Sequence, residues 1–177
     1  MGNPTDFEKE CYTRVLKGHI DLAKIKFPRG VKGAHLDVLA RSNLWQNFMD
    51  YAHGTGHGVG HFLSVHESPP NISRAAINQI PLAEGMVISN EPGYYIDGKF
   101  GIRLESLVVV KESEHPSFLE FETMTLVPFQ GNLIAREMMD KSQLDWLDNY
   151  QESVVSIHKH NLSPHESDWL IRHVKSA

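Results

Sequence analysis

The sequence predicts an α+β fold in which helices at both ends of the chain flank a mainly antiparallel sheet. Apolar residues recur at helical spacing before residue 50 and after residue 140. Between these stretches the chain changes to short apolar or alternating runs interrupted by Pro and Gly, as in the strands of an antiparallel sheet. At 177 residues, 41% of them hydrophobic, the chain is long enough to bury a core of its own.

The first two helices are expected near the N-terminus. Thr5 can cap the first helix, with Glu8 three residues later as its capping-box partner, and Phe27-Pro28 ends the run. The second is expected from Leu36 to Met49, where apolar residues share one side and glycines stand on both flanks.

The middle of the chain is expected to form strands. Asp97-Gly98 lies between two short aromatic-rich runs and is a hairpin signal. The expected strands are Val59–Val65, Met86–Ser89, Tyr94–Ile96, Ile102–Val110 and Phe118–Val127.

Two further helices are expected to close the chain. One starts near Asp140 and carries an apolar stripe through Leu144, Leu147 and Val154. The other opens with Ser163-Pro-His-Glu, which is a capping box with Pro at the first helical position.

The composition excludes several classes of function. There are 17 basic and 22 acidic residues, with no basic stripe, so nucleic acid is not an expected partner. No apolar run reaches the length of a membrane span, and the polar N-terminus has no signal-peptide character. The single cysteine excludes an internal disulfide and is typical of a reducing compartment.

A segment in which glycines alternate with other residues carries three histidines, His53, His57 and His61. Four glycines between residues 53 and 61 disfavour a helix, so a strand or extended loop is expected, with the three imidazoles on one face. Glycine at alternate positions also lets another backbone or a ligand approach closely. His66 has the opposite parity, so the strand must bend or bulge if both His57 and His66 serve one site. The alternative is a glycine-rich strand with partly exposed polar histidines.

Two glutamates stand in unusual surroundings. Glu91 follows an apolar run and precedes the turn signal Pro92-Gly93, and Glu105 is embedded in a strongly apolar strand. A carboxylate in such a strand is expected to be paired or metal-bound, because burying a free charge is costly. The alternative is a surface ion pair between Arg103 and a glutamate, which stabilises little.

The hairpin signal gives the two glutamates a relative position. If residues 97–99 form the loop, Ile96 faces Phe100, and counting back along both strands places Glu91 opposite Glu105. Opposed carboxylates repel unless a cation lies between them. This count holds only if Pro92-Gly93 leaves the register unbroken. One imidazole and two carboxylates from separate segments would then form a ligand set for a divalent metal.

These segments resemble those of the pita-bread metallopeptidases, most closely the cytosolic Xaa-Pro aminopeptidase (aminopeptidase P) group. The resemblance extends over nearly the full length and is specific because several motifs occur together. The matching stretches are His53-Gly-Thr-Gly-His57-Gly-Val-Gly, Val65-His66-Glu67, Glu84-Gly85-Met86, Asn90-Glu91-Pro92-Gly93-Tyr94-Tyr95, Phe100-Gly-Ile-Arg103-Leu-Glu105 and Thr125-Leu126-Val127-Pro128.

The resemblance implies a centre with two divalent ions, usually Mn²⁺, with Co²⁺ or Zn²⁺ as alternatives. His57 matches the histidine ligand of one metal. Glu91 matches a carboxylate ligand of the same metal that also handles the proton of the attacking water. Glu105 matches the carboxylate that bridges both metals.

On the substrate side, His53 and His66 match histidines that contact the substrate and stabilise the tetrahedral intermediate, and Arg103 lines the site. His61 lies outside the family's pattern and receives no role. The implied reaction is hydrolysis of the bond before a proline in second position, by a metal-activated hydroxide. The implied partners are such peptides and a second copy of the chain, in the cytoplasm, without membrane or nucleic acid.

The family's metal site also uses two aspartates from an Asp-Val-Thr-Arg-Thr-like segment, which this sequence lacks. The resemblance therefore implies the C-terminal half of a pita-bread (creatinase/aminopeptidase-like) fold, with a curved antiparallel sheet and flanking helices, inactive alone. Residues 1–130 would be a partial catalytic domain and residues 131–177 a helical tail packed on it. Two alternatives remain: another pita-bread peptidase, such as a prolidase or methionine aminopeptidase, and a non-catalytic pita-bread module that binds proteins.

Overall fold

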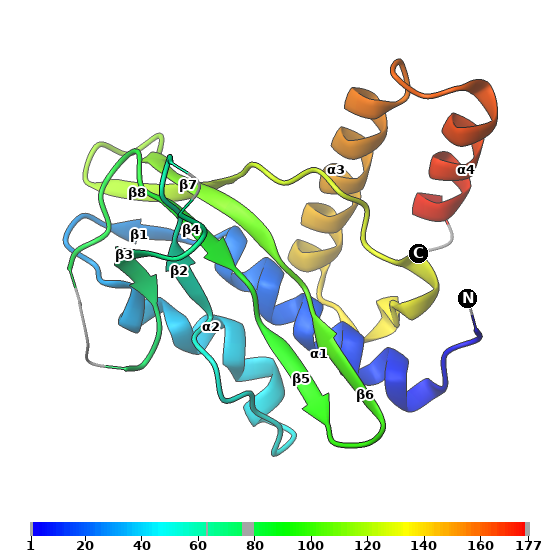
Figure 1. The fold of residues 1–177 in the computed structure, drawn as a ribbon, viewed down its shortest axis with the longest axis horizontal. Helices are drawn as coiled ribbons and strands as arrows, with labels where there is room; N and C mark the ends of the chain where they lie inside the picture. The colour runs from blue at the N-terminus through cyan, green and yellow to red at the C-terminus, as the bar shows by residue number, and fades with distance from the viewer. Residues whose placement is uncertain (1, 63, 76–79, 176–177) are drawn as a thin grey trace. The chain divides into compact units, whose positions relative to one another are not determined.

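The computed structural model describes residues 2–62, 64–75 and 80–175 (Figure 1). The chain divides into two compact units. One comprises residues 15–125, and the other combines residues 1–14 with residues 126–177. Helices and antiparallel strands are both present, as the predicted α+β class requires.

Residues 15–125 contain a six-stranded sheet of order β1-β8-β7-β4-β2-β3 and a separate ribbon, β5-β6. Every strand pair in the described residues is antiparallel, as predicted. The strands are β1 (Lys26–Pro28), β2 (Gly56–Gly58), β3 (Glu67–Ile72), β4 (Val87–Asn90), β5 (Gly93–Ile96), β6 (Phe100–Arg103), β7 (Ser106–Glu112) and β8 (Phe118–Thr123).

The prediction of a strand at Val59–Val65 is wrong. β2 lies earlier, and the chain turns back immediately after it, since the Gly60 amide donates to the Ser64 carbonyl at 2.8 Å. The next strand, β3, was not predicted, because Pro69 and Pro70 argue against a strand. β3 stands at the end of the sheet order, where a missing backbone donor is tolerated.

The predicted strand Ile102–Val110 is two strands. β6 ends at Arg103 and β7 begins at Ser106, and between them the chain passes from the ribbon into the main sheet. The predicted strand Phe118–Val127 is shorter, because β8 ends at Thr123. β1 was missed, since three residues give too little pattern to read.

The first helix, α1 (Asp6–Ala23), begins with the predicted capping box. Thr5 and Glu8 exchange hydrogen bonds, with the Thr5 amide donating to Glu8 Oε2 at 2.7 Å. The second, α2 (Gly33–Trp45), starts and ends earlier than predicted. It cannot continue to Met49, because Phe48 adopts a φ of 59°, which is outside the helical region.

The core of residues 15–125 is formed by α1, α2 and the sheet. Its aliphatic and aromatic side chains come from segments far apart in the sequence, so the sheet and both helices share one hydrophobic cluster. The buried members are Leu22, Phe27, Leu36, Ala40, Ile72, Leu82, Ile88, Val108, Val110, Leu119 and Phe121.

The second unit contains α3 (Lys141–His158), α4 (Pro164–Lys175) and two short 3₁₀ turns, η1 (Gly131–Leu133) and η2 (Arg136–Met138). The predicted capping box of α4 is present, since the Ser163 amide donates to Glu166 at 2.9 Å. α3 starts where predicted, and Asp140 caps it by accepting from the Gln143 amide at 2.9 Å.

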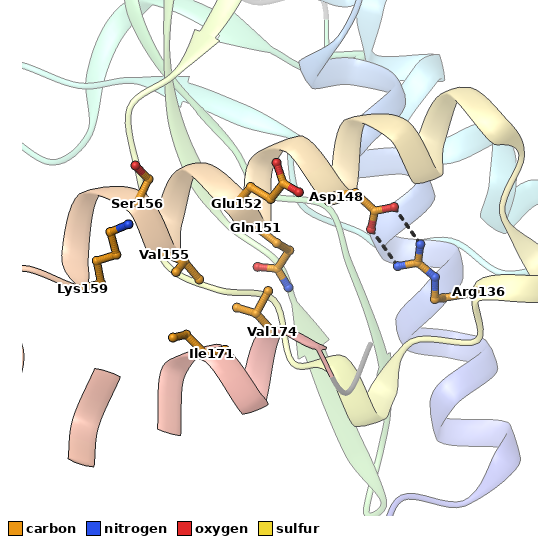
Figure 2. Close-up of a pocket in the computed structure, with 9 residues that line it drawn as sticks. All are labelled: Arg136, Asp148, Gln151, Glu152, Val155, Ser156, Lys159, Ile171 and Val174. Carbon is orange, nitrogen blue, oxygen red and sulfur yellow. Dashed lines mark hydrogen bonds and ion pairs between the residues drawn. The ribbon is translucent and has the colours of Figure 1, made fainter. Parts of the chain in front are cut away.

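A hollow of about 730 Å³ is lined by α3, α4 and Arg136 (Figure 2). Arg136 forms a two-pronged ion pair with Asp148 at its rim, with both N–O distances at 2.9 Å. None of the predicted site residues lines this hollow. Within the described residues, no helix combines the length and the apolar character that crossing a membrane requires.

Candidate metal centre

Three predicted ligand residues converge in space. His57 lies on β2, Glu91 directly follows β4, and Glu105 lies between β6 and β7. One ligand atom from each lies within 4.8 Å of the other two. The glycine-histidine segment and the two glutamates therefore meet at one place, although 48 residues of sequence separate His57 from Glu105.

The register of two neighbouring ladders places the carboxylates face to face. Asn90 pairs with Ser106 where β4 meets β7, and Gly93 pairs with Arg103 where β5 meets β6. Two residues lie between these pairs on each strand, so Glu91 stands opposite Glu105. The Leu104 amide donates to the Pro92 carbonyl at 3.1 Å, which keeps this register through the proline. The predicted opposition of the glutamates is confirmed.

His57 presents one ring nitrogen to Glu91. Its Nδ1 lies 2.9 Å from the Gly58 carbonyl oxygen and must carry the proton there, because a carbonyl only accepts. In the neutral imidazole, Nε2 is then a lone-pair acceptor, and it lies 3.2 Å from Glu91 Oε1. Two acceptor atoms this close need a proton or a metal cation between them. The ring is thus oriented as in histidines that bind metal through Nε2.

Glu91 is held through both its backbone and its side chain. Its amide donates to the Thr55 carbonyl at 2.7 Å, and its Oε1 accepts from the Ser89 hydroxyl at 3.0 Å. The Ser89 oxygen in turn accepts from the His57 amide at 2.9 Å. Glu91 is 9% exposed, so its side chain has little freedom to turn away from His57. Glu105, by contrast, is exposed.

The three donors fit a divalent cation. Metal–ligand bonds to imidazole and carboxylate are roughly 2.0–2.6 Å, so two ligand atoms of one ion lie at most about 4–5 Å apart. The observed limit of 4.8 Å matches this range. One imidazole nitrogen with two carboxylate oxygens is a donor set for Mn²⁺, Co²⁺ or Zn²⁺ rather than for a soft ion.

Beside these donors runs a directed chain of hydrogen bonds. Arg103 Nε donates to the Tyr95 hydroxyl at 2.9 Å, and this hydroxyl lies 2.9 Å from His53 Nε2. His53 Nδ1 faces the Gly54 carbonyl at 2.7 Å and therefore carries the proton, so Nε2 accepts from Tyr95. His53 and Arg103 are thus joined through Tyr95.

The alternative of an Arg103–glutamate ion pair is present only in loose form. Arg103 Nη1 lies 3.7 Å from Glu91 Oε2, and the Arg103 side chain is 46% exposed. Arg103 also bonds to Tyr95, and its pKa is raised. Burial lowers that pKa, but Tyr95 and the nearby glutamates outweigh it. The ion pair alone therefore does not explain the buried glutamate.

The bulge required for His57 and His66 to meet is present. The register of β2 against β3 shifts between His57 and Gly58, and the two imidazole rings meet edge to face with centroids 4.4 Å apart. His61 lies in the exposed turn after β2, beside Phe62, and is not part of the cluster. Gly56 lies so close to β4 that a Cβ atom would stand 1.9 Å from the Ser89 carbonyl oxygen.

Two residues of this site escaped the sequence analysis. Tyr95 links His53 to Arg103, and Ser89 links His57 to Glu91. A signal for Ser89 exists, since it is the polar residue two positions before Glu91 in an apolar strand. Tyr95 has no comparable signal, because an aromatic residue in a strand is usually explained by packing.

Comparisons with known proteins agree with this geometry. The model of metallopeptidase family M24 matches residues 1–112, and the model of the C-terminal region of peptidase M24 matches residues 117–177. A probable Xaa-Pro aminopeptidase P of Laccaria bicolor is 51% identical over 157 residues, covering 85% of this chain and 24% of that protein. Aminopeptidase P1 of Arabidopsis thaliana is 43% identical over 177 residues, covering 96% of this chain and 27% of that protein.

Solved structures show the same likeness. An X-prolyl aminopeptidase of Caenorhabditis elegans, described as a cytosolic enzyme with a di-nuclear active site, matches with a TM-score of 0.88 and 36% identity. It covers 97% of this chain, which spans 29% of that protein. An Xaa-Pro dipeptidase of Bacillus anthracis matches with a TM-score of 0.61 and 32% identity, covering 72% of this chain and 33% of its own. The chain thus spans about a quarter of the curated relatives, 24% and 27% in the two cases above.

Proposed function

The chain belongs to metallopeptidase family M24, and we propose that it supplies the metal-binding part of an Xaa-Pro aminopeptidase. Such an enzyme removes the N-terminal residue from peptides with proline in second position. The observation that carries the proposal is the convergence of His57, Glu91 and Glu105, with ligand atoms within 4.8 Å of one another. The pita-bread fold expected from the sequence agrees with the match to the nematode enzyme.

The likeness to an aminopeptidase extends further along the chain than the likeness to a dipeptidase. The nematode aminopeptidase covers 97% of the chain, whereas the Bacillus dipeptidase covers 72%. The C-terminal region of peptidase M24 also matches residues 117–177. The curated relatives compared above are named as aminopeptidases, which makes the prolidase alternative less favoured. The retained metal donors likewise weigh against a non-catalytic protein-binding module.

We propose two divalent ions, Mn²⁺ first, for the complete enzyme. When bound, the ions supply a hydroxide nucleophile and neutralise charge at the substrate carbonyl. In this chain His57 and Glu91 would hold one ion, and Glu105 would bridge to the second. The family's two further aspartate ligands have no counterpart among the described residues, so this chain alone would bind one ion weakly and turn over little or no substrate.

The other residues act on protons and on the substrate. Glu91, fixed by Ser89 and by the Thr55 carbonyl, would accept the proton of the attacking water. His66, next to His57, and His53 would contact the substrate and stabilise the tetrahedral intermediate. Arg103 would line the site, and its hydrogen bond to Tyr95 keeps the proton of the Tyr95 hydroxyl directed at His53 Nε2.

The remaining parts of the proposal concern the rest of the protein. Residues 1–130 would belong to the catalytic domain and residues 131–177 would form its C-terminal tail. The natural partners would be proline-containing peptides and a second copy of the protein, and the location would be the cytoplasm, as for the nematode enzyme described as cytosolic.

A chimera tests the proposed activity directly. The matching segment of the nematode aminopeptidase is replaced by this chain, and hydrolysis of Xaa-Pro peptides is measured with Mn²⁺. Activity is expected, and it should fall by more than about 100-fold in His57→Ala, Glu91→Gln and Glu105→Gln. His61→Ala, beyond the cluster, is the matched control and should retain activity. A well-folded chimera that is inactive, or insensitive to the three substitutions, would refute the proposal.

A further inference from the structure

Helix α2 carries a buried ion pair close to the candidate metal centre. Asp37 and Arg41 are one helical turn apart, and their side chains are 2% and 1% exposed. Arg41 Nε donates to Asp37 Oδ2 at 2.7 Å. Two charges removed from water in this way seldom add stability over apolar side chains of similar size, so the pair needs another reason to exist.

The remaining hydrogen bonds of Arg41 point to one segment. Nη1 donates to Asp50 Oδ1 and to the Tyr51 carbonyl, both at 2.7 Å, and Nη2 donates to the His53 carbonyl at 2.8 Å. The guanidinium also lies 3.8 Å from the centre of the Tyr51 ring. A planar guanidinium with several fixed donors sets the positions of all these acceptors together, which an ammonium group does not.

Asp37 contacts the same segment two residues further on. Its Oδ1 accepts from the Thr55 hydroxyl, which also hydrogen-bonds to the Tyr51 hydroxyl. Thr55 is fully buried, and its carbonyl accepts from the Glu91 amide at 2.7 Å. The ion pair is therefore connected to His53 through Arg41, and to the backbone of Glu91 through Asp37 and Thr55.

The electrostatics of the site favour a charged Arg41 guanidinium. Burial disfavours the charge on Arg41, but the hydrogen bonds to Asp37 and Asp50 outweigh it and raise the pKa of Arg41. Burial also raises the pKa of Tyr51 to about 12, so the ring beneath the guanidinium stays neutral. The Arg41 guanidinium thus stays charged across the physiological pH range.

We propose that Asp37 and Arg41 are positioning residues that fix the segment 50–55, and that they thereby aim the His53 imidazole at Tyr95 and seat the backbone of Glu91. The positioning itself stands on the hydrogen bonds above. Only its consequence for catalysis rests on the proposed function.

Amide hydrogen exchange, resolved by NMR, tests the positioning on the chain as it exists. In Arg41→Met the amides of Thr55 and Glu91, bonded to the Ile72 and Thr55 carbonyls, should exchange about tenfold faster or more. Leu36→Ala, a core truncation in the same helix, is the matched control for lost stability. At equal residual stability it should speed exchange across the whole sheet without singling out Thr55 and Glu91.

The ¹⁵N chemical shifts of the His53 imidazole give a second measurement, which a general loss of stability does not change. These shifts, assigned with His53→Gln, report whether Nε2 still accepts a hydrogen bond. In Arg41→Met the Nε2 signal should move toward that of a free imidazole, whereas Leu36→Ala should leave it in place. Arg41→Lys should restore it only in part, because lysine cannot reach all four acceptors.

Two results would overturn the proposal: unchanged His53 shifts in Arg41→Met, or equal exchange patterns in Arg41→Met and Leu36→Ala. If Arg41→Met does not fold, Arg41→Lys and Asp37→Asn take its place. Each should then disturb only the segment it contacts, Arg41→Lys at His53 and Asp37→Asn at Thr55. Neither measurement uses a metal or a substrate, so failure here differs from failure of the proposed peptidase activity.

Discussion

The side-chain amide of Asn90 donates to the main-chain carbonyl of His19 at 3.0 Å, and both residues are fully buried. The backbone of Leu104 and of Asn90 also acts on the His19 imidazole and favours its protonated form. These two residues directly precede Glu105 and Glu91, so α1 braces both strand segments that carry the carboxylates. Burial lowers the pKa of His19 to about 4, against which the backbone contacts act only in part.

This histidine should make stability depend on pH. Its folded pKa of about 4 lies below the ordinary value of 6.5, so between these values the unfolded chain binds a proton that the native chain does not. The contribution of His19 to the free energy of unfolding is therefore fully present above the unfolded pKa and is lost as the pH falls below it. We expect a loss of about 2 kcal/mol from His19 between about pH 7 and pH 5. Urea unfolding of the wild type and of His19→Gln measures it, and parallel pH dependences in the two would contradict the assignment.

The isolated chain should bind Mn²⁺ at a single weak site, since His57, Glu91 and Glu105 are its only clustered donors among the described residues. At a Mn²⁺ concentration tenfold above Kd, the free energy of unfolding should rise by about 1.4 kcal/mol. Calorimetric titration measures the affinity and the number of sites, and thermal unfolding with and without Mn²⁺ measures the gain in stability. Glu105→Gln should remove the effect, and Glu122→Gln, an exposed residue of β8, should not. Two tight sites would mean that further ligands come from elsewhere.

Gly56→Ala should be strongly destabilising, because its Cβ would stand 1.9 Å from the carbonyl oxygen of Ser89. Backbone must move to relieve this contact, at a cost of roughly 1–3 kcal/mol or more. Gly54→Ala, two residues earlier, is the matched control, since its Cβ would make only ordinary contacts, with the Ser73 side chain at 3.5 Å and the Ile72 carbonyl oxygen at 3.7 Å. Chemical unfolding of the two variants should therefore differ clearly, and equal stabilities would contradict the close approach of β2 to β4.

Asp140→Ala should lower the stability of α3. Asp140 accepts from the Gln143 amide at 2.9 Å, and its own amide donates to the Gln143 side chain at 3.2 Å. Loss of such a cap costs about 1 kcal/mol. Asp140→Ser retains an acceptor and should recover most of that loss. If Asp140→Ser is no more stable than Asp140→Ala, the cap contributes nothing measurable.

The purified chain should form a dimer or a larger oligomer. Trp169 on α4 is 49% exposed, whereas Tyr150 on α3 is buried within its own unit and bonds to Val127, so only the former is available to a partner. Size-exclusion chromatography with light scattering measures the mass. A monomer of 20.0 kDa at micromolar concentration would remove the support for self-association.

The carboxylate pair could be predicted because a hairpin signal fixes register over a short distance, and the proline between Glu91 and the ribbon did not shift it. The capping boxes were predictable for the same reason, since each is local. The edge strands were not. β1 is too short to show a period, and β3 contains two prolines, which its edge position tolerates.

The network around Arg41 also escaped the sequence analysis, for a different reason. Asp37 and Arg41 are spaced four residues apart, which is the ordinary pattern of an exposed helical ion pair. Their burial depends on the segment 50–55, which folds over them. No local sequence pattern predicts such a contact. The same holds for Tyr95, whose role is visible only once His53 and Arg103 are placed beside it.

The pairing of β1 with β8 joins two segments that are synthesised far apart in time. Lys26 lies opposite Glu120, so the strand that follows α1 has no partner until almost a hundred further residues have left the ribosome. Contacts this distant in sequence form slowly, and the nascent chain meanwhile exposes the apolar side chain of Phe27. A chain that ends before residue 118 would therefore leave the backbone of β1 and the side chain of Phe27 without their β8 partner.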